Sequence, residues 1–338
     1  MSLESYWYRS YLHPLLIPLL PFSLAFGFII RLRRWSYRLG LKKSQRFPIP
    51  VIIVGNISVG GTGKTPLIIT LANYLKEQGK KPGIALRGVG GKIKKATLIT
   101  ANSNPFEVGD EAVLIAINTA CPVAACIDRP AAAQLLQKAG CDLILCDDGL
   151  QHYALARQLE IAVIDSSRYF GNGFLLPAGP LREPIARLNE VDFLVVQETD
   201  QALQSPLSKT KKPFYMQLQP QTFQSTHFPQ QTLALSSFCR QKVHAVAGIG
   251  NPQRFFDLLT RLQIEFIPHP FPDHHRYKMN DLAFSDQLPL VMTEKDAIKC
   301  KRLAFDEASK KKQWFLRVTT KVSSELKHAL LELISKPC

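Results

Sequence analysis

The sequence lacks the features that define several protein classes. Its seven cysteines are an odd number in a chain of 338 residues, which argues against a disulfide framework and for a reducing cytosol. Four of them form two C-x4-C pairs between residues 121 and 146, but structural zinc sites prefer tighter spacings. The sequence also has no internal repeat and no extended low-complexity tract. A secreted disulfide scaffold and a zinc module are therefore not expected.

Acidic residues are scarce as well. The chain has 27 Asp and Glu against 42 Lys and Arg, which gives a formal net charge of +15. This excess predicts an anionic partner: nucleic acid, a nucleotide or an acidic membrane. No nucleic-acid recognition motif is recognisable, so we expect no nucleic-acid partner. A hydrophobic content of 46% and a charged content of 20% are typical of a globular protein, and the length suffices for two lobes.

One long apolar run lies near the amino terminus. Its 17 residues, 14–30, carry no charge, and Pro14, Pro18 and Pro21 interrupt the first half of the run. This length is the lower limit for a membrane-spanning helix. A signal peptide would need positive charge before the run and a small-residue cleavage site after it. Here the positive charge follows the run and no convincing site is present.

Basic residues surround this run. Residues 1–50 contain eight Lys and Arg and one acid, a net charge of +7. Basic and aromatic residues beside an apolar run favour a segment, residues 1–47, that lies in the interface of an anionic, cytoplasmic leaflet. A spanning helix and a hydrophobic helix packed on the protein's own core are the alternatives. The residues expected at headgroup level are Trp7, Tyr8, Tyr11 and Trp35, and those expected to enter the membrane are Leu15, Leu16, Leu19, Leu20, Phe26 and Phe28.

A phosphate-binding loop is predicted after the apolar, β-branched run of residues 51–54, which has the composition of a buried strand. Leucines spaced by four after residue 66 predict a helix behind the loop, so the loop would lie at a positive helix N-terminus. The strict P-loop pattern has a glycine where this chain has Ser58. Because the strand, the loop, Lys64-Thr65 and the helix coincide, we still favour nucleotide binding over an ordinary glycine-rich turn.

The residues of this loop have distinct expected roles. Glycines can take a positive φ, which lets successive backbone N–H groups surround phosphate oxygens. Lys64 would reach the β- and γ-phosphates of ATP, and the hydroxyl of Thr65 would bind Mg²⁺. A proline is acceptable in the first turn of the helix. The residues assigned to ATP binding are Gly60, Gly61, Thr62, Gly63, Lys64, Thr65 and Pro66.

Two acids end a later apolar strand, predicted over residues 142–149. Ligands bind at the carboxyl ends of strands in doubly wound sheets. Asp147 and Asp148 are therefore expected to complete the Mg²⁺ site begun by Thr65, as an acid after an apolar strand does in P-loop enzymes. The alternative is that the two acids cap the next helix.

Strand and helix signals alternate through most of the chain, which predicts a doubly wound parallel sheet with helices on its faces, a P-loop α/β fold. Strands are expected at 81–88, 122–127, 142–149, 160–165 and 191–197, and helices at 109–119 and 129–140. A second βα series begins at 242. The predicted units are a kinase core at 48–200, an irregular connection at 201–240 and a smaller α/β lobe at 241–338 that closes on the active site.

Seven motifs occur in one order along nearly the whole chain: GNISVGGTGKTP, VGDEA, DDGLQH, LPAGPLREP, AGIGNPQRFF, FPDHH and TEKDAIKC. With the apolar, basic amino terminus, they resemble the tetraacyldisaccharide 4′-kinases. The resemblance implies an enzyme that uses ATP and Mg²⁺. Its acceptor would be the 4′-hydroxyl of an acylated glucosamine disaccharide 1-phosphate, a lipid A precursor embedded in the membrane. The expected location is the cytoplasmic face of the inner membrane, as a monotopic protein.

The resemblance also assigns roles. Asp110 resembles the catalytic acid that accepts the hydroxyl proton, and His274 its partner, with the neighbouring His275 as the less favoured choice. From the residues alone, Asp110 would be an acid at a helix N-terminus. Arg182 is expected to neutralise charge on the transferring phosphoryl group, and Glu183 to support Mg²⁺ or that arginine. A surface ion pair is the alternative for these two.

Some points stay open. The family usually has Arg-Gly-Tyr-Gly where this chain has Arg87-Gly88-Val89-Gly90, which leaves the role of that loop undecided. Arg129 would contact phosphate or cap its surroundings, and Lys295 would face nucleotide, a lipid phosphate or solvent. The alternative function is a membrane-associated nucleotide switch related to partitioning ATPases. Those proteins carry a lysine before the two glycines, whereas this chain has Val59.

Overall fold

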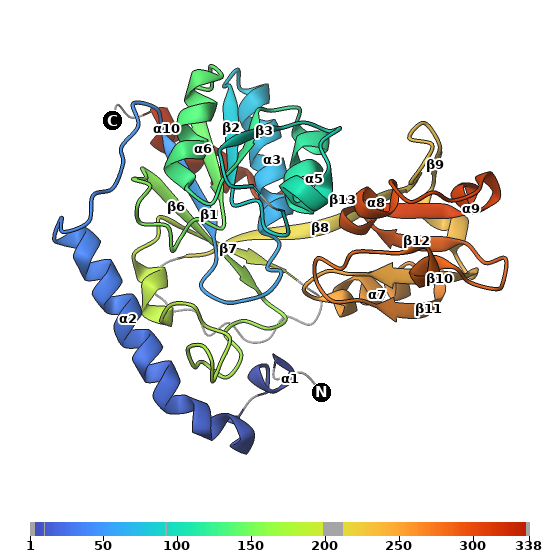
Figure 1. Ribbon diagram of the computed structural model, residues 1–338, viewed down its shortest axis with the longest axis horizontal. Helices are drawn as coiled ribbons and strands as arrows, with labels where there is room; N and C mark the ends of the chain where they lie inside the picture. Colours follow the sequence, from blue (N-terminus) through green and yellow to red (C-terminus); the bar gives the residue numbers. More distant parts are fainter. Residues whose placement is uncertain (1–3, 10, 92, 199–211, 336–338) are drawn as a thin grey trace.

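The computed structural model describes residues 4–9, 11–91, 93–198 and 212–335 (Figure 1). Its strands form one 13-stranded sheet in the order β11-β10-β12-β13-β8-β7-β6-β1-β5-β2-β4-β3, with β9 paired to β8 outside this path. We call residues 48–198 the first half and residues 226–312 the second half. The two halves lie side by side and are joined by β8 and β13.

The first half is a parallel sheet with helices on both faces, as predicted. Its parallel strands are β1 (Val51–Gly55), β2 (Pro82–Leu86), β4 (Val123–Ala125), β5 (Leu143–Asp147), β6 (Leu159–Asp165) and β7 (Phe193–Gln197), with β3 (Thr97–Ile99) antiparallel at the edge. Its helices are α3 (Lys64–Glu77), α4 (Pro105–Val108), α5 (Asp110–Thr119), α6 (Arg129–Lys138) and the 3-10 helix η2 (Ile185–Asn189). The predicted strands and helices of this half are confirmed.

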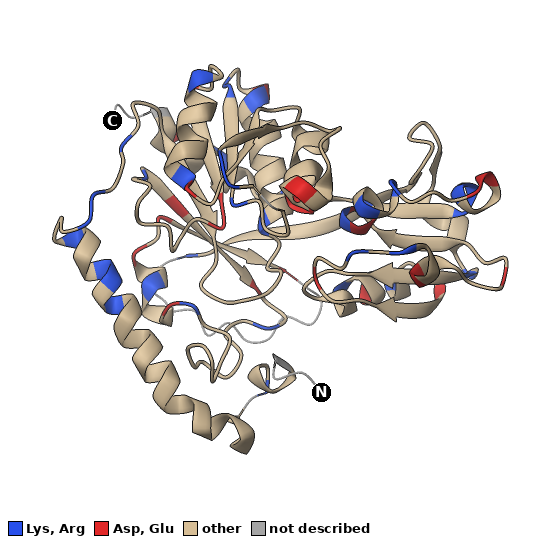
Figure 2. Cartoon of the chain, in the orientation of Figure 1, with Lys and Arg blue, Asp and Glu red and all other residues tan. Residues whose placement is uncertain are grey.

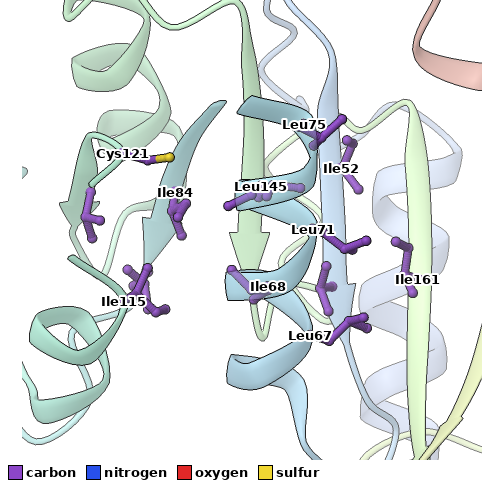
Figure 3. Close-up of a cluster of buried hydrophobic side chains, with 14 of the residues drawn as sticks. Ile52, Leu67, Ile68, Leu71, Leu75, Ile84, Ile115, Cys121, Leu145 and Ile161 are labelled. Carbon is purple, nitrogen blue, oxygen red and sulfur yellow. The ribbon is translucent and has the colours of Figure 1, made fainter. Parts of the chain in front are cut away.

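Apolar side chains fix α3 against the sheet. Leu67, Ile68, Leu71 and Leu75 recur on one face of the helix and are fully buried. Figure 3 shows them over the strand side chains of Ile52, Leu145 and Ile161. Each such side chain contributes roughly 1.5–3 kcal/mol on burial. This packing holds the start of α3 at the carboxyl end of β1, where the glycine-rich loop lies.

The second half contributes three parallel strands to the same sheet and has a separate core. These strands are β10 (Lys242–Ala247), β11 (Glu265–Pro270) and β12 (Leu290–Thr293), and the short β9 (Thr232–Leu233) pairs antiparallel with β8. Its helices are η3 (Leu235–Phe238), α7 (Pro252–Arg261), η4 (Met279–Leu282), α8 (Glu294–Cys300) and α9 (Glu307–Lys311). Phe255, Phe256 and Leu259 of α7 pack on this sheet.

Two long strands join the halves. β8 (Phe214–Ser225) and β13 (Gln313–Val322) pair antiparallel, so the predicted irregular connection at 201–240 is wrong over β8. Residues 201–211 of this predicted connection lie outside the described residues. After β13 the chain returns to the first half as α10 (Ser324–Ser335), and Leu326 and Leu330 are fully buried in the core beneath α3. The predicted division into units otherwise stays a prediction.

The amino-terminal segment consists of α1 (Glu4–Trp7), η1 (Pro14–Leu19) and α2 (Leu20–Arg38). α2 runs along one side of the first half (Figure 1). The Ser23 hydroxyl donates to the carbonyl of Leu175 at 2.9 Å and accepts from the N–H of Ala178 at 2.9 Å. A Cβ on Gly27 would lie 2.8 Å from Leu175 Cδ1, so this glycine allows the close approach of α2.

Most of this segment's apolar surface faces outward. Pro14–Arg38 is long and apolar enough to cross a membrane by length and composition alone, and 17% of its most apolar stretch is buried in the protein. The predicted membrane face is partly wrong: Leu16 is fully buried in the protein, and Leu19, Leu20 and Phe26 are half-buried. The large apolar side chains that are exposed here are Leu15, Ile17, Phe22, Leu24, Phe28, Ile29, Leu32 and Trp35. The docking of α2 through Ser23 and Gly27 decides which face remains free.

Candidate functional site

The glycine-rich loop is held in place from both halves. Gly63 has a φ of +85° and precedes the first turn of α3. A Cβ on Gly63 would clash with the side chain of Gln197, so glycine is required there for two reasons. A Cβ on Gly250 would lie 3.0 Å from the backbone nitrogen of Gly61, which places a turn of the second half directly against the loop.

Lys64 and Arg182 meet at one carboxylate. Lys64 Nζ lies 3.3 Å from Asp148 Oδ1, and Arg182 Nη1 lies 2.8 Å from Asp148 Oδ2. Burial alone would raise the pKa of Asp148, but the two cations outweigh it and hold that pKa well below its usual range. Two positive charges thus share one negative charge beside the glycine-rich loop, which leaves the group with a surplus of positive charge for an anionic ligand.

Asp147 lies at the carboxyl end of β5 and is buried. Burial and the nearby charge of Glu111 raise the pKa of Asp147 to about 7. Its Oδ1 has no hydrogen-bond partner among the residues that the structure describes. An orphaned, buried carboxylate oxygen of this kind fits a hard divalent cation. Within the same residues, no group of three or more His, Cys, Asp or Glu side chains is arranged to hold a metal ion.

Arg129 and Glu183 both lie in the protein interior. The Arg129 guanidinium is almost fully buried and donates to the backbone carbonyl of Asp147 at 2.7 Å, so it fixes the end of β5. Glu183 is fully buried, and its two oxygens accept hydrogen bonds from Tyr153 and Gln151. The alternative of a surface ion pair is therefore wrong for Glu183. Its predicted support of Mg²⁺ stays a prediction.

A second cluster forms around Asp110, the first residue of α5. His274 Nδ1 lies 3.0 Å from Asp110 Oδ1 and 3.2 Å from Oδ2. Because an ionised carboxylate only accepts, this ring nitrogen carries the proton. The hydrogen bond to Asp110 raises the pKa of His274. His275 pairs instead with Asp281, at 3.1 Å, so the two adjacent histidines have different partners.

Two lysines of α8 complete this cluster. Lys295 Nζ and Lys299 Nζ lie 3.9 Å and 3.8 Å from Asp110 Oδ2. Burial alone would raise the pKa of Asp110, but the hydrogen bond from His274 and the charges of both lysines hold that pKa below its usual value. Lys295 also pairs with Glu111 at 3.2 Å and with Asp273 at 3.0 Å. The alternative of a solvent-facing side chain is therefore wrong for Lys295, while its contact with nucleotide or a lipid phosphate stays a prediction.

Sequence reasoning missed Lys299 and Arg254. The four-residue spacing of Lys295 and Lys299 on a helix would have placed both on one face. Arg254, near the start of α7, pairs with Asp165 at the end of β6 and donates to Gln197 Oε1 at 3.1 Å. This arginine therefore connects the second half to the glutamine that packs against Gly63.

The loop at residues 87–91 lies beside the Asp110–His274 pair. A Cβ on Gly90 would lie 3.5 Å from His274 Nδ1, and one on Gly109 would lie 2.6 Å from the carbonyl oxygen of Val89. The side chain of Val89 is exposed. The loop is therefore placed to contact whatever approaches Asp110, and Val89 presents a smaller apolar surface there than the aromatic residue expected from the resemblance.

Comparisons with known proteins agree on one family. The sequence model of the family described as Tetraacyldisaccharide-1-P 4′-kinase matches residues 15–335. A tetraacyldisaccharide 4′-kinase of Methylobacillus flagellatus is 45% identical over 99% of this chain and 96% of its own length. One from Coxiella burnetii is 47% identical over 89% of this chain and 86% of its own length. A crystal structure of "apo" form LpxK from Aquifex aeolicus in complex with ATP is 30% identical, has a TM-score of 0.77, and covers 95% of this chain and 99% of that one.

Proposed function

The chain belongs to the tetraacyldisaccharide-1-P 4′-kinase family, and from that premise we propose how its residues perform the reaction. The enzyme transfers the γ-phosphoryl group of ATP to the 4′-hydroxyl of an acylated glucosamine disaccharide 1-phosphate, a lipid A precursor. The observation that carries the proposal is the pair of charge clusters, one around Asp148 beside the glycine-rich loop and one around Asp110 at the contact between the halves.

ATP binds with its phosphates at the start of α3. Backbone N–H groups of residues 60–65 donate hydrogen bonds to the phosphate oxygens. Lys64 and Arg182 both pair with Asp148. In the complex with ATP, the two cations also interact with the β- and γ-phosphates. Charge on the three outer oxygens of the transferring group is thereby stabilised, and this is where most of the catalysis of phosphoryl transfer arises.

The acceptor hydroxyl approaches the Asp110–His274 pair. As the new O–P bond forms and the bond from the γ-phosphorus to the β-bridging oxygen breaks, ADP leaves with the electron pair and the hydroxyl proton passes to Asp110. His274 orients the carboxylate through its Nδ1 hydrogen bond. A base with a lowered pKa serves a late proton transfer, which suits the loose transition state of this reaction. Lys295 and Lys299 keep Asp110 ionised in its buried setting.

The residues at the end of β5 fit Mg²⁺. Asp147 Oδ1 and Asp148 Oδ1 are both buried without a hydrogen-bond partner in the described structure. Asp148 forms ion pairs with Lys64 and Arg182, whereas no ion pair of Asp147 is seen among the described residues. We therefore assign the metal to Asp147 and the Thr65 hydroxyl, and we keep Glu183, which is held by hydrogen bonds from Gln151 and Tyr153, as a residue that supports the site. When bound, Mg²⁺ would neutralise charge on the β- and γ-phosphate oxygens.

The acceptor remains in the membrane, so the enzyme has to reach it there. The exposed apolar side chains of η1 and α2 form a surface that suits the interface of a bilayer. Basic residues gather toward the carboxyl-terminal end of α2 and in the segment that follows (Figure 2). They suit an anionic leaflet, the cytoplasmic face of the inner membrane. A nucleotide and a membrane together account for the positive charge without a nucleic-acid partner.

A nucleotide switch related to partitioning ATPases is not favoured, because the relatives that match nearly the whole chain are named as kinases. The test is transfer of labelled phosphate from ATP to a defined acylated disaccharide 1-phosphate in detergent micelles. The labelled lipid should appear only with ATP, acceptor and enzyme together. Steady ATP hydrolysis without acceptor, and no labelled lipid with it, would contradict the proposal.

A further inference from the structure

A cavity of about 580 Å³ lies between the carboxyl-terminal end of α2 and the first half. We call it the arginine cavity, because five arginines line it: Arg34, Arg38, Arg46, Arg157 and Arg187. It is lined on one side by Val51, the first residue of β1, whereas the glycine-rich loop follows the last residue of that strand. At roughly 3.3 Å per residue the two ends of β1 are about 13 Å apart, so this cavity is distinct from the ATP site.

Positive charge exceeds negative charge in the arginine cavity. Glu160 and Glu190 are the acids among the residues that line it. Glu190 pairs with Arg34 and Arg38, and Glu160 pairs with Arg157 and Arg187. Behind the lining, Glu183 lies 3.9 Å from Arg187. Three carboxylates thus face five guanidinium groups, which leaves a surplus of two positive charges for a ligand.

One guanidinium in this cavity is already neutralised by the protein. Arg187 is only 3% exposed, and its Nη2 pairs with Glu160, while its Nε and Nη1 lie 3.9 Å and 3.8 Å from Glu183 and Glu190. Arg46, in contrast, is exposed at the cavity, and the described structure shows no ion pair for it. A ligand with several acceptor oxygens would pair with Arg46 and with Arg38, whose side chain is 59% exposed and shares Glu190 with Arg34.

The surroundings of the cavity indicate the source of such a ligand. Trp35, Leu39 and Leu41 are each 65% or more exposed on the same end of α2 and in the turn after it. Tyr153 lines the cavity under the Arg34 and Arg157 guanidinium groups, at 5.9 and 5.4 Å from its ring centroid. A phosphate group in the cavity would therefore be followed at the rim by exposed apolar side chains, as a lipid requires.

We propose that the arginine cavity binds the phosphate headgroup of an anionic membrane phospholipid. The headgroup phosphate would pair with Arg46 and Arg38 while the acyl chains remain in the bilayer beside Trp35 and Leu39. This site would set the position of α2 in the leaflet. The inference goes beyond the phosphoryl transfer proposed above; it depends on the proposed membrane association and on none of the proposed catalytic residues.

Two variants test separately the positive charge and the free volume of the arginine cavity. Arg46→Gln removes an exposed, unpaired charge from the cavity, and Ala156→Phe fills part of the cavity without changing the charge. Arg31→Gln is the matched control, because Arg31 is an exposed arginine of α2 outside the cavity. The probes are glycerophosphoglycerol and inorganic phosphate in solution, and vesicles of phosphatidylcholine with or without phosphatidylglycerol.

The full-length protein should bind glycerophosphoglycerol, and Arg46→Gln should weaken this binding by about tenfold, the loss expected for one charge-assisted phosphate contact. Ala156→Phe should abolish the preference for phosphatidylglycerol vesicles in flotation, and Arg31→Gln should keep binding of the soluble probe. Equal flotation of Ala156→Phe and the unchanged protein would overturn the proposal. So would inorganic phosphate binding as tightly as the glycerol diester. Flotation on vesicles of phosphatidylcholine alone measures the membrane binding of the apolar surface of α2. Kinase activity in micelles measures the proposed reaction. A failure of the headgroup site can therefore be distinguished from a failure of either of these.

Discussion

The charge cluster around Asp148 and the one around Asp110 are built in opposite ways. Asp148, Lys64 and Arg182 all come from the first half, within 120 residues of chain and around one sheet edge. Asp110 also comes from the first half, but His274, Lys295 and Lys299 come from the second. The phosphate-binding cluster is thus complete within one half, while the proton-accepting cluster exists only when both halves are in contact.

The geometry of the two clusters therefore depends on the contact between the halves to different degrees. The ion pairs of the Asp148 cluster use no residue of the second half, which reaches this cluster only indirectly, through Gly250 and Arg254 beside the glycine-rich loop. A cluster shared between the halves responds to any change in their contact, so acceptance of the proton is tied to the arrangement of both. Variants of the two clusters should therefore fail in different ways.

The largest effect is expected for Lys64→Ala. This change removes the cation at the start of α3 that faces the phosphates, and kcat should fall by about 10⁴-fold, as for other cations that stabilise a transferring phosphoryl group. Phosphate transfer to the acceptor in micelles measures it. Lys138→Ala, an exposed lysine at the end of α6, is the matched control. A near-normal kcat for Lys64→Ala would contradict the assignment of the loop.

The next effect concerns the shared cluster. Asp110→Asn should lower kcat by about 10²–10⁴-fold, the range of general base catalysis, with little change in the binding of ATP. His274→Ala should also lower kcat. Since the two side chains act as a unit, the double variant should lose far less than the product of the single losses.

Steady-state kinetics of the three proteins decides between a unit and two independent residues. His275→Ala serves as the control, because His275 pairs with Asp281 away from Asp110. Fully multiplicative losses would show that Asp110 and His274 work separately.

A smaller effect tests the contact between the halves at the ATP side. Arg254→Gln removes the bridge from α7 to Asp165 and Gln197. Because Gln197 packs on Gly63, KM for ATP should rise by about tenfold while kcat changes less, as for a residue that positions the loop. The stability should fall too, since Asp165 is left buried without its cation.

A second variant separates the two consequences of that change. Asp165→Asn combined with Arg254→Gln leaves no unpaired carboxylate, so its thermal stability should exceed that of Arg254→Gln alone while its KM for ATP stays raised. An unchanged KM in both proteins would remove Arg254 from any role in positioning the loop.

The smallest effect is a pH-dependent stability. The pKa of His274 is raised in the folded protein, so its pairing with Asp110 stabilises fully below the ordinary histidine value of 6.5 and is lost as the pH rises through the folded value. Asp110 has a lowered pKa, so its contribution is present above 3.8 and is lost as the pH falls through its folded value.

Thermal unfolding measures this contribution. The difference in midpoint between the unchanged protein and His274→Gln should be largest at about pH 5.5 and small at about pH 9, which lie below and above the histidine range. His328→Gln, an exposed histidine of α10, should show no such trend. A difference independent of pH would mean that His274 stabilises only by packing.

The two clusters also differ in how far the sequence predicts them. Strand, glycines, Lys64 and helix are consecutive, so local patterns suffice for the phosphate-binding loop. Asp110 and His274 are 164 positions apart, and only the resemblance to a family joined them. Nothing local distinguishes Arg254 from a surface arginine on an amphipathic helix, and its partners lie on strands of the other half.

The docked face of α2 and the strand β8 are not predictable from the local sequence. The face of α2 was assigned from hydrophobicity alone, but Ser23 and Gly27 decide which side docks, and neither is conspicuous in an apolar run. β8 was missed although Phe214, Met216 and Leu218 alternate with polar residues, because the segment also contains Pro220 and several glutamines.

The return of the chain through β13 and α10 has a consequence for biosynthesis. Val322, Leu326 and Leu330, among the last residues described, belong to the same core as Ile52 and Leu71. A nascent chain therefore cannot finish the core of its ATP-binding half until the residues up to Leu330 have left the ribosome. During that interval the apolar amino-terminal segment is already available to a membrane. The order of synthesis thus allows the protein to meet the bilayer before it is able to bind nucleotide.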